Sequence, residues 1–502
     1  MSIALDFGTS TTFIANRDGV LPIGSGMAAS MPSVVGYSDD GALVIGEEAQ
    51  SAPLGQVVRS VKRAITQRRD FVDVAFPSGV RDVGVDDLIG HLLHEVVRRG
   101  AVRGQDLTAP GAVRLGCPAM WDGRQRRRLL DAAQRAGMAL TMEGLVDEPV
   151  AAGIAWLAAH PSGTDAPLRM LVFDMGGGTL DIAVLDVRGP NHHEISVLAA
   201  VGVGEGGDAL DESIADDLDF MLASEGLDVL AQPRAELLHE QLVDAARSTK
   251  VALSAEGVTE VPIVLPPAFG GIEIWYERDR IEAVFQRQME RAEHYVGAAL
   301  RVARMTELVG RSAADIARLP IEALVADIDL VLLSGGMTQL PYVEQRLRWL
   351  FPDTTRIERA ALPPDQAVAL GLARAGNYGR INMYRPAFDV VLDWADGRGF
   401  RTVYEAFTPL VEAAQLAPGG GDLRFIRTGA DLGLPREGAG RLRVVSYSDS
   451  KVRATLGGAK LDGFAVAFAD QFEFSIYPNG RIRITDASGV HEGQIEDWHT
   501  IS

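Results

Sequence analysis

The sequence predicts an α/β fold with a duplicated core, followed by a small domain of antiparallel strands. Apolar strands alternate with helical patterns over roughly the first 375 residues, which is typical of sheets with parallel strands. Further along the chain, short alternating strands are separated by Gly-containing turns. In addition, a glycine-rich strand–turn–strand unit occurs twice, once in each half of the α/β region.

The central copy of this unit is MLVFDMGGGTLDIAVLDV, residues 170–187. Asp174 ends its first strand, and Asp181 lies on its second. The intervening glycines let backbone N–H groups approach an anion, because no Cβ obstructs them. An aspartate at a strand end is suited to hold a divalent cation through water, and the Thr179 hydroxyl can donate to phosphate. Alone, this segment would indicate only a tight hairpin with an acidic corner.

The N-terminal copy is IALDFGTSTTFIAN, residues 3–16. Asp6 matches Asp174 and Thr11 matches Thr179 at the same offsets, which is the pattern of an internal repeat. Two such hairpins facing each other across a cleft would form a clamp for a nucleoside triphosphate and its metal. We therefore expect two lobes, each contributing one hairpin.

Composition excludes several classes of function. The formal net charge of −20 argues against nucleic-acid binding through a basic surface. The single cysteine, Cys117, cannot form an internal disulfide, which suits a reducing compartment. The N-terminus lacks the pattern of a signal peptide, and the longest apolar run, near 323–333, is interrupted by Asp327 and Asp329. We expect a cytoplasmic protein with no membrane partner.

Between the hairpins, two residues with catalytic potential lie in helical patterns. Lys62 falls in an expected helix over 53–69, where a solvated lysine is the ordinary interpretation. Glu148 opens a helix over 148–159, where an acid commonly serves only as a cap. Further helices are expected over 85–99 and 122–136, and a strand over 112–117.

After the central hairpin, a second glycine turn at 204–208 opens another helix. A buried strand over 329–333 runs into Gly335 and Gly336. The remaining expected elements are strands over 194–201 and 262–275 and helices over 234–255, 280–304, 341–350 and 366–375.

Nine stretches together resemble the DnaK-type 70-kDa heat-shock chaperones of the actin/hexokinase-type ATPase superfamily. They span residues 3–373 in the family's order. The β region resembles the family more weakly. The stretches are IALDFGTSTT, VKRAI, GCPAMWDGRQRRRLLDAAQRAG, VDEPVAAGIAW, LVFDMGGGTLDIAVLDV, GEGGDALDESI, STKVALS, LVLLSGGMTQLPYVEQRL and PPDQAVALGLA.

The resemblance implies a two-lobed actin-like ATPase with duplicated ribonuclease-H-like cores, over residues 1–376, with lobe I about 1–165 and lobe II about 166–376. It also implies a linker at 377–387 and a β-sandwich-like, substrate-binding-like domain at 388–502. The helical lid usual after that domain is not expected here, so peptide release should be fast.

The same resemblance implies ATP or ADP with Mg²⁺ as ligands. Asp6 and Asp174 would hold the metal through water. Pro118 and Arg126 would form the interdomain switch pair. The implied catalytic residues are Lys62, Glu148, Asp181 and Thr179, and the implied nucleotide-binding residues are Gly8, Thr9, Ser10, Thr11, Gly176, Gly177, Gly178, Gly206, Gly207, Arg247, Lys250, Ser254, Gly335, Gly336, Met337, Gln339 and Asp365.

The chain departs from the family where the adenine would bind. Two arginines that usually sandwich the base are replaced by Val251 and Gln339, and an acid that contacts the ribose becomes Arg247. Stacking of a desolvated guanidinium on a ring stabilises binding by about 1 kcal/mol or more. Loss of both arginines would therefore weaken ATP binding by roughly tenfold. We expect Arg247, one helical turn before Val251, to reach over the base instead.

A second departure concerns coupling between domains. Residues 389–393 could be the family's apolar linker or the first strand of a hairpin, and the following ADGRG turn favours the hairpin. Positions that contact J-domain co-chaperones hold Gly144, Asp147 and Val150, which are not the usual residues. Stimulation by a standard J-protein is therefore not expected.

The sequence thus predicts an ATP-hydrolysing, chaperone-like protein whose β domain binds unfolded or extended polypeptide. A small-metabolite kinase of the same superfamily is an alternative, but it leaves the β domain unexplained. A nucleotide-responsive scaffold with little hydrolysis is a second alternative, which the altered adenine site keeps open.

Overall fold

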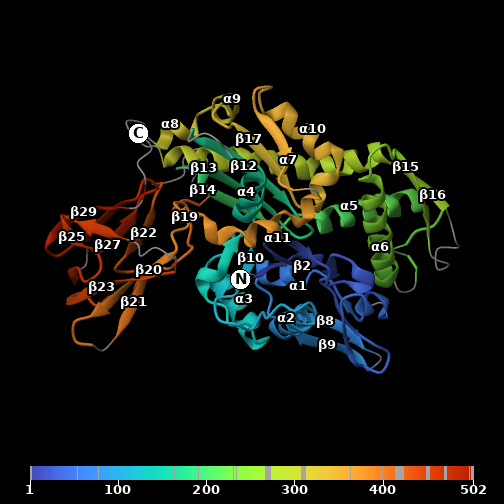
Figure 1. Ribbon diagram of the computed structural model, residues 1–502, viewed down its shortest axis with the longest axis horizontal. Helices are drawn as coiled ribbons and strands as arrows, with labels where there is room; N and C mark the ends of the chain where they lie inside the picture. Colours follow the sequence, from blue (N-terminus) through green and yellow to red (C-terminus); the bar gives the residue numbers. More distant parts are fainter. Residues whose placement is uncertain are drawn as a thin grey trace.

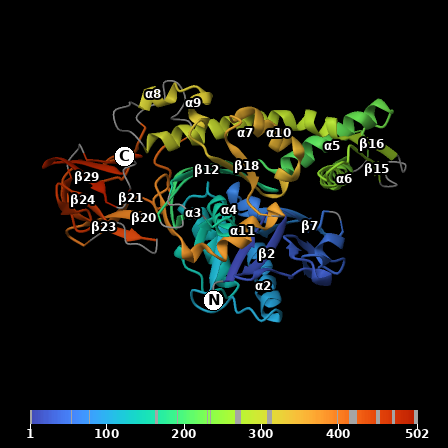
Figure 2. The same cartoon turned by 45° about the horizontal axis from the view of Figure 1, so that its top comes forward.

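A computed structural model provides the structure of the chain. It describes residues 3–53, 55–76, 78–161, 166–189, 192–229, 231–232, 235–265, 273–306, 313–361, 363–397, 399–412, 423–447, 453–468, 472–496 and 498. Two α/β lobes are stacked on each other, and a β domain lies at one end of the molecule (Figures 1 and 2).

Lobe I is built around a sheet with the order β11-β10-β1-β2-β3, with β4 paired to β2. β1 and β2 form the antiparallel N-terminal hairpin, while β1, β10 and β11 run parallel. Its strands are β1 (Ile3–Phe7), β2 (Thr11–Asn16), β3 (Gly19–Leu21), β4 (Ser30–Pro32), β5 (Val35–Tyr37), β6 (Leu43–Ile45), β7 (Val57–Val58), β8 (Phe71–Phe76), β9 (Gly79–Gly84), β10 (Val113–Cys117) and β11 (Leu145–Asp147).

Lobe II repeats this topology with the order β18-β17-β12-β13-β14, and β19 extends the sheet. The central hairpin is antiparallel and its first strand is parallel to β17, as in lobe I. The fold class predicted from the repeat is therefore confirmed. The strands are β12 (Leu168–Met175), β13 (Leu180–Arg188), β14 (Glu194–Val203), β15 (Glu260–Val264), β16 (Glu273–Glu277), β17 (Leu330–Ser334), β18 (Arg356–Arg359) and β19 (Gly379–Asn382).

Two matching helices pack against each other between the two sheets. α4 (Glu148–Ala159) follows β11, and α11 (Ala367–Leu372) follows β18. A Cβ at Gly371 would overlap the carbonyl oxygen of Ala151, so glycine permits this close backbone approach. The two helices form the floor of the cleft between the lobes, because Glu148 of α4 and Val368 of α11 both line the cavity there.

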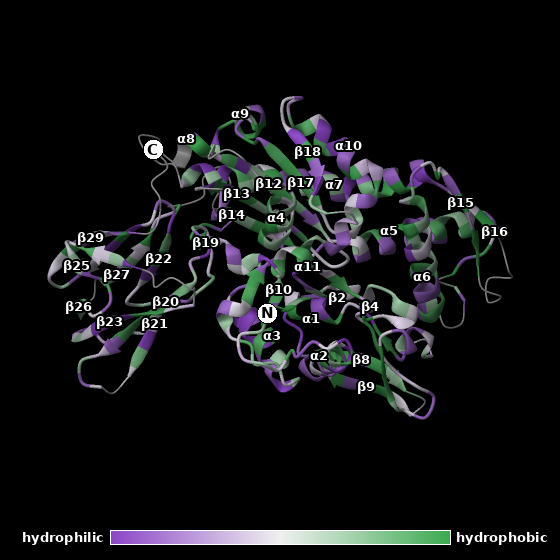
Figure 3. Cartoon of the chain, in the orientation of Figure 1, coloured by the Kyte–Doolittle hydropathy of each residue, from purple (hydrophilic) through white to green (hydrophobic). Residues whose placement is uncertain are grey.

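The other helices pack around the two sheets or on one another, and the strands of the sheets are strongly hydrophobic (Figure 3). No helix in the described part of the chain is long and apolar enough to cross a membrane. The helices are α1 (Val61–Thr66), α2 (Val85–Val102), α3 (Gly123–Arg135), α5 (Gly207–Ser224), α6 (Ala235–Leu253), α7 (Arg278–Met305), α8 (Ala313–Ala317), α9 (Ile321–Val325) and α10 (Pro341–Leu350).

The β domain consists of two facing antiparallel sheets, β21-β20-β23-β26 and β22-β27-β28-β29-β24-β25. Tyr404 joins them, because its ring contacts Phe388 at 5.5 Å and Phe425 at 4.9 Å between ring centres. The strands are β20 (Phe388–Trp394), β21 (Phe400–Tyr404), β22 (Phe425–Thr428), β23 (Gly438–Ser446), β24 (Ala454–Leu456), β25 (Ala459–Lys460), β26 (Ala465–Phe468), β27 (Glu473–Ile476), β28 (Arg481–Asp486) and β29 (Gly489–Ile495).

The structure corrects two expectations from the sequence and settles a third that had been left open. The helix expected over 53–69 is only α1, because residues 57–58 pair with β5 as β7. Residues 389–393 lie in β20, which pairs with both β21 and β23 and is therefore a hairpin strand. Within the expected linker, β19 pairs in parallel with β14, so this part of the connector belongs to the sheet of lobe II.

Candidate functional site

A cavity of about 310 Å³ lies between the lobes and is lined by both glycine hairpins. It brings together most of the residues that the sequence singled out. On its wall are Asp6, Gly8, Thr9, Ser10, Thr11, Lys62, Glu148, Asp174, Gly176, Gly177, Thr179, Gly207, Arg247, Lys250, Val251, Ser254, Gly335, Gly336, Met337, Gln339 and Asp365.

The two hairpins approach each other closely at one end of this cavity, the phosphate end. A Cβ at Gly178 would lie 2.7 Å from Thr9 Oγ1 and 2.8 Å from its Cγ2. A Cβ at Gly177 would overlap the Ser10 hydroxyl. Glycine is therefore required on the lobe II hairpin for the two turns to face each other at this separation.

A buried ion pair lies beside the hairpins. Lys62 Nζ donates to Glu148 Oε1, and both residues are buried. Burial alone would lower the pKa of Lys62, but the carboxylates of Glu148 and Asp6 outweigh it and raise the pKa. Lys62 thus stays charged at the floor of the cleft, where it can face an anion.

Three buried aspartates surround this pair. Burial, followed by the charge of Glu148, raises the pKa of Asp6 to about 7. The same two causes raise the pKa of Asp181 to about 7 and hold the pKa of Asp174 well above its usual value. Four carboxyl groups thus crowd around one lysine, and their raised pKa values reflect a mutual repulsion that a bound divalent cation would relieve.

The residues present fit a hydrated cation at this end of the cavity. Asp365 Oδ1 is buried on the cavity wall without a hydrogen-bond partner, although it is an obligate acceptor. Among the described residues, no group of three or more His, Cys, Asp or Glu side chains is placed to bind a metal directly. Asp6 and Asp174, which are predicted to hold Mg²⁺ through water, both line this part of the cavity.

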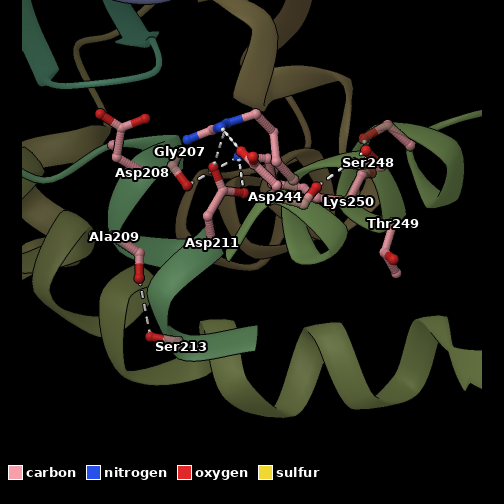
Figure 4. A network of polar contacts seen from close by, with 12 residues as sticks. Gly207, Asp208, Ala209, Asp211, Ser213, Asp244, Ser248, Thr249 and Lys250 are labelled. Carbon is pink, nitrogen blue, oxygen red and sulfur yellow. Dashed lines mark hydrogen bonds and ion pairs between the residues drawn. The ribbon is translucent and has the colours of Figure 1, made fainter. Parts of the chain in front are cut away.

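A second wall of the cavity, called the base end below, is formed by α5 and α6 beside the lobe II hairpin, and two basic residues of α6 are held there by acids. Lys250 Nζ lies 2.6 Å from Asp211 Oδ1 and donates to the Gly207 carbonyl oxygen at 2.9 Å (Figure 4). Asp211 is 1% exposed, and burial raises its pKa despite the nearby cations. Lys250 is therefore fixed against the glycine turn that opens α5.

Arg247 also lines the cavity, but two carboxylates bind its guanidinium. Its Nε is 3.3 Å from Asp211 Oδ2, and its Nη1 donates to Asp244 Oδ1 at 2.8 Å. Asp244 in turn lies 3.5 Å from Arg59 Nε, across the cleft in lobe I. Acids of α5 and α6 thus hold the guanidinium, and the reach of Arg247 over a bound base stays a prediction.

Several residues of this network were not singled out from the sequence. Asp208 lines the cavity and accepts a 2.5 Å hydrogen bond from Ser60 of lobe I. Asp208 lies in the first turn of α5, directly after the predicted glycine turn, and Asp211 follows one turn later, so their positions were a usable signal. Arg59 and Asp244 carry no local pattern, because they meet only when the lobes pack.

Three predicted residues lie just behind the cavity wall. Asp181 accepts a 3.3 Å hydrogen bond from the backbone N–H of Met120. Gly178 faces Thr9, and the carbonyl of Gly206 accepts a hydrogen bond from Gln288 at 3.0 Å. These residues support the wall and its charge rather than forming its surface.

Arg126, one of the two residues of the expected switch pair, does not line the cavity but binds Asp147, the residue before Glu148. It is 1% exposed and donates to Asp147 Oδ1 at 2.6 Å. Its Cζ lies 4.3 Å from the centre of the Phe407 ring, which the β domain contributes. Pro118 begins the turn before α3, and its carbonyl accepts from the Trp121 N–H. Arg126 therefore joins the residue preceding Glu148 to the β domain.

Comparison with known proteins agrees with this architecture. The model of the family described as Hsp70 protein matches residues 108–380, which is more than half of the chain. The chain belongs to the Hsp70 family. Residues 3–16, which form the first glycine hairpin, lie outside the matched range, yet their position in the sheet repeats that of the matched hairpin.

Individual relatives in the Hsp70 family are distant. A chaperone protein DnaK 1 from Synechococcus sp. is 28% identical over 404 residues, covering 74% of this chain and 49% of that protein. A chaperone protein HscA homolog from Chromobacterium violaceum is 30% identical over 405 residues, covering 75% and 58%. A chaperone protein DnaK from Thermosipho africanus is 26% identical, covering 74% and 58%. The chain thus spans about half the length of the relatives it matches.

Proposed function

We propose that this Hsp70-family protein binds ATP with Mg²⁺ between its lobes and hydrolyses it slowly. The observation that carries this proposal is the buried Lys62–Glu148 pair between two facing glycine hairpins. Phosphoryl transfer to water needs a cation on the γ-phosphate and an acid that positions the water, and these two residues supply both. Bound Mg²⁺ would neutralise developing charge on the phosphate oxygens.

Each residue at the phosphate end has a distinct part in this proposal. Backbone N–H groups of the turns at Gly8–Thr11 and Gly176–Thr179 bind the β- and γ-phosphates. Lys62 binds the γ-phosphate. Glu148 orients the attacking water, and Asp181, whose pKa of about 7 suits proton acceptance near neutral pH, takes up its proton.

We further propose that the β domain binds extended polypeptide and that the nucleotide changes this binding. Among the described residues, β21 is the outermost strand of its sheet and carries Phe400, which is 61% exposed, so its outer edge offers a place for β-augmentation. The contact of Arg126 with both Asp147 and Phe407 provides the physical route between the two domains.

ATP turnover measured with and without an unfolded peptide tests both proposals. We expect slow turnover that peptide stimulates and that Lys62→Ala abolishes. Lys460→Ala is the matched control, because Lys460 is an exposed residue of the β domain. Turnover that survives Lys62→Ala would contradict the catalytic assignment.

The same assay separates the alternatives. Turnover that requires a small acceptor molecule would favour a metabolite kinase. Nucleotide binding without turnover, in the presence or absence of peptide, would favour a nucleotide-responsive scaffold. Binding of peptide that does not change between ADP and ATP would contradict the proposed coupling.

A further inference from the structure

We propose that one hydrogen bond across the cleft, from Ser60 of lobe I to Asp208 of lobe II, sets the position of Lys62 when the lobes close. Ser60 and Asp208 are then positioning residues, because they act on hydrolysis through Lys62. The inference rests on the proposed function, since it requires Lys62 to act on the nucleotide. Three observations carry it: the backbone conformation of Ser60, the direction of its hydroxyl, and the attachment of Asp208 to a glycine hairpin.

Ser60 has a backbone conformation that residues other than glycine rarely adopt. Its φ is 54° and its ψ is 36°, in the left-handed region, directly before α1. Such a conformation persists only where surrounding contacts hold it. It also sets the direction in which α1 leaves the preceding segment, and Lys62 lies in the first turn of α1. A contact that holds Ser60 therefore also holds Lys62.

The contact that holds Ser60 comes from the other lobe. A serine directly before a helix usually accepts a hydrogen bond from the backbone of that helix. The Ser60 side chain makes no such bond with α1, and its hydroxyl instead donates to Asp208 Oδ2 at 2.5 Å. Arg63 Nη1, one turn further along, lies 3.9 Å from the same oxygen. One carboxylate of lobe II thus contacts α1 at two places.

Asp208 is in turn attached to the central glycine hairpin. Its backbone N–H donates to the carbonyl oxygen of Gly177 at 2.7 Å. Figure 4 shows its carboxylate pointing away from the ion pairs that Asp211 forms, so it is free to accept from lobe I. These bonds form a continuous path from the turn at residues 176–179 to the helix that carries Lys62. A phosphate that orders this turn therefore orders the path as well.

The path makes hydrolysis depend on closure of the cleft. The donor belongs to lobe I and the acceptor to lobe II, so the bond exists only while the lobes are together. Lys62 is buried beside Glu148, and a displacement of a catalytic group by about 1 Å can lower a rate about a hundredfold. An open cleft leaves α1 without this support, which restricts hydrolysis to the closed state.

Ser60→Gly tests the donor by single-turnover hydrolysis of Mg²⁺–ATP by the full chain. Glycine adopts the left-handed backbone without strain, so Tm should change little while the hydroxyl is lost. We expect hydrolysis to slow by about 10- to 100-fold, and the dissociation constant of Mg²⁺–ADP to change by less than about threefold. Ser51→Gly, at an exposed serine of lobe I, is the matched control. Hydrolysis by Ser60→Gly at the wild-type rate would overturn the inference.

Two variants of Asp208 separate the hydrogen bond from the charge. Asp208→Ala and Asp208→Asn both remove the charge, but only alanine removes the acceptor oxygen. We expect Asp208→Ala to slow hydrolysis as much as Ser60→Gly does, and Asp208→Asn to retain most of the rate. Equal losses in the two variants would overturn the inference. Asp216→Ala, at an exposed acid of α5, is the control.

The double variant Ser60→Gly/Asp208→Ala should be no slower than either single variant, because both changes remove the same bond. Losses that multiply would overturn the inference. If Lys62→Ala abolishes hydrolysis while Ser60→Gly and Asp208→Ala retain the wild-type rate, the inference fails and the proposed function stands. Hydrolysis that survives Lys62→Ala would overturn both, since no catalytic lysine would need positioning.

Discussion

The two ends of the proposed nucleotide cavity are built in different ways. At the phosphate end, two copies of one backbone turn face each other, and the surrounding carboxylates exceed the available positive charge. At the base end, Arg247 and Lys250 of α6 form ion pairs with Asp211 of α5. Backbone groups bind phosphate whatever the side chains are, whereas a base is read by side chains. The phosphate end therefore keeps its chemistry through sequence change that alters the base end.

The largest expected difference between the two ends is in catalysis. Glu148→Gln removes the partner of Lys62 and the acid that orients water, so turnover should fall by about 10²- to 10⁴-fold. ADP affinity should change by only a few-fold, because the base end is untouched. Single-turnover hydrolysis and equilibrium binding measure the two effects separately. Glu143→Gln, an exposed acid five residues before Glu148, should have neither effect.

Matched glycine substitutions compare the steric demands of the two ends. Gly178→Ala would place a methyl group against Thr9 and separate the hairpins, so turnover should fall by about tenfold or more. Gly336→Ala at the base end meets nothing within 4 Å and should be nearly silent. Equal losses in the two variants, measured as turnover at saturating ATP, would show that hairpin separation does not limit hydrolysis.

The pH dependence of stability should also originate at the phosphate end. The pKa values of Asp6 and Asp181 are raised from 3.8 to about 7 in the folded protein. Protonation of these two groups therefore stabilises the ligand-free protein. This contribution to the free energy of unfolding is complete below pH 3.8 and is lost as the pH rises through 7. Mg²⁺–ADP favours the ionised carboxylates. Its stabilising shift in Tm should therefore be several degrees larger at pH 8 than at pH 6. A shift that does not change with pH would contradict the assignment, and Asp6→Asn should reduce the difference.

The smallest effect is expected from Arg247→Ala. Lys250 still neutralises Asp211, and Arg59 still faces Asp244, so the network loses one member without leaving a buried charge unpaired. We expect ADP affinity to fall only a few-fold. Unchanged affinity would exclude Arg247 from the site, while a loss of about tenfold or more would support a stacking role over the base.

Local repetition made much of the fold predictable. Asp6 and Asp174 occupy equivalent strands because the same short pattern specifies the same hairpin twice, and the sheet order then follows from the duplication. The hairpin at residues 389–393 was favoured from its glycine turn. In contrast, the helix expected near Lys62 was overextended, because apolar residues of a short edge strand such as β7 also fit helical spacing.

Contacts between lobes were beyond sequence reasoning. Arg59 and Asp244, or Arg126 and Phe407, are far apart in the chain, and no spacing rule relates them. The pairing of Arg247 with Asp244, three residues earlier on α6, follows helical spacing, whereas its contact with Asp211 of α5 could not be predicted because it forms only when the two helices pack. The phosphate end was therefore predicted in more detail than the base end.

The single cysteine provides an internal reporter on the junction between domains. Cys117 is buried, accepts from Arg126 Nη1 at 3.1 Å, and has its pKa raised by burial to about 12. A thiol with this pKa is almost entirely protonated at neutral pH and unreactive toward alkylating reagents. The rate at which Cys117 is labelled would therefore report how often the Arg126 guanidinium moves away from Cys117 and Asp147, and no engineered probe is needed.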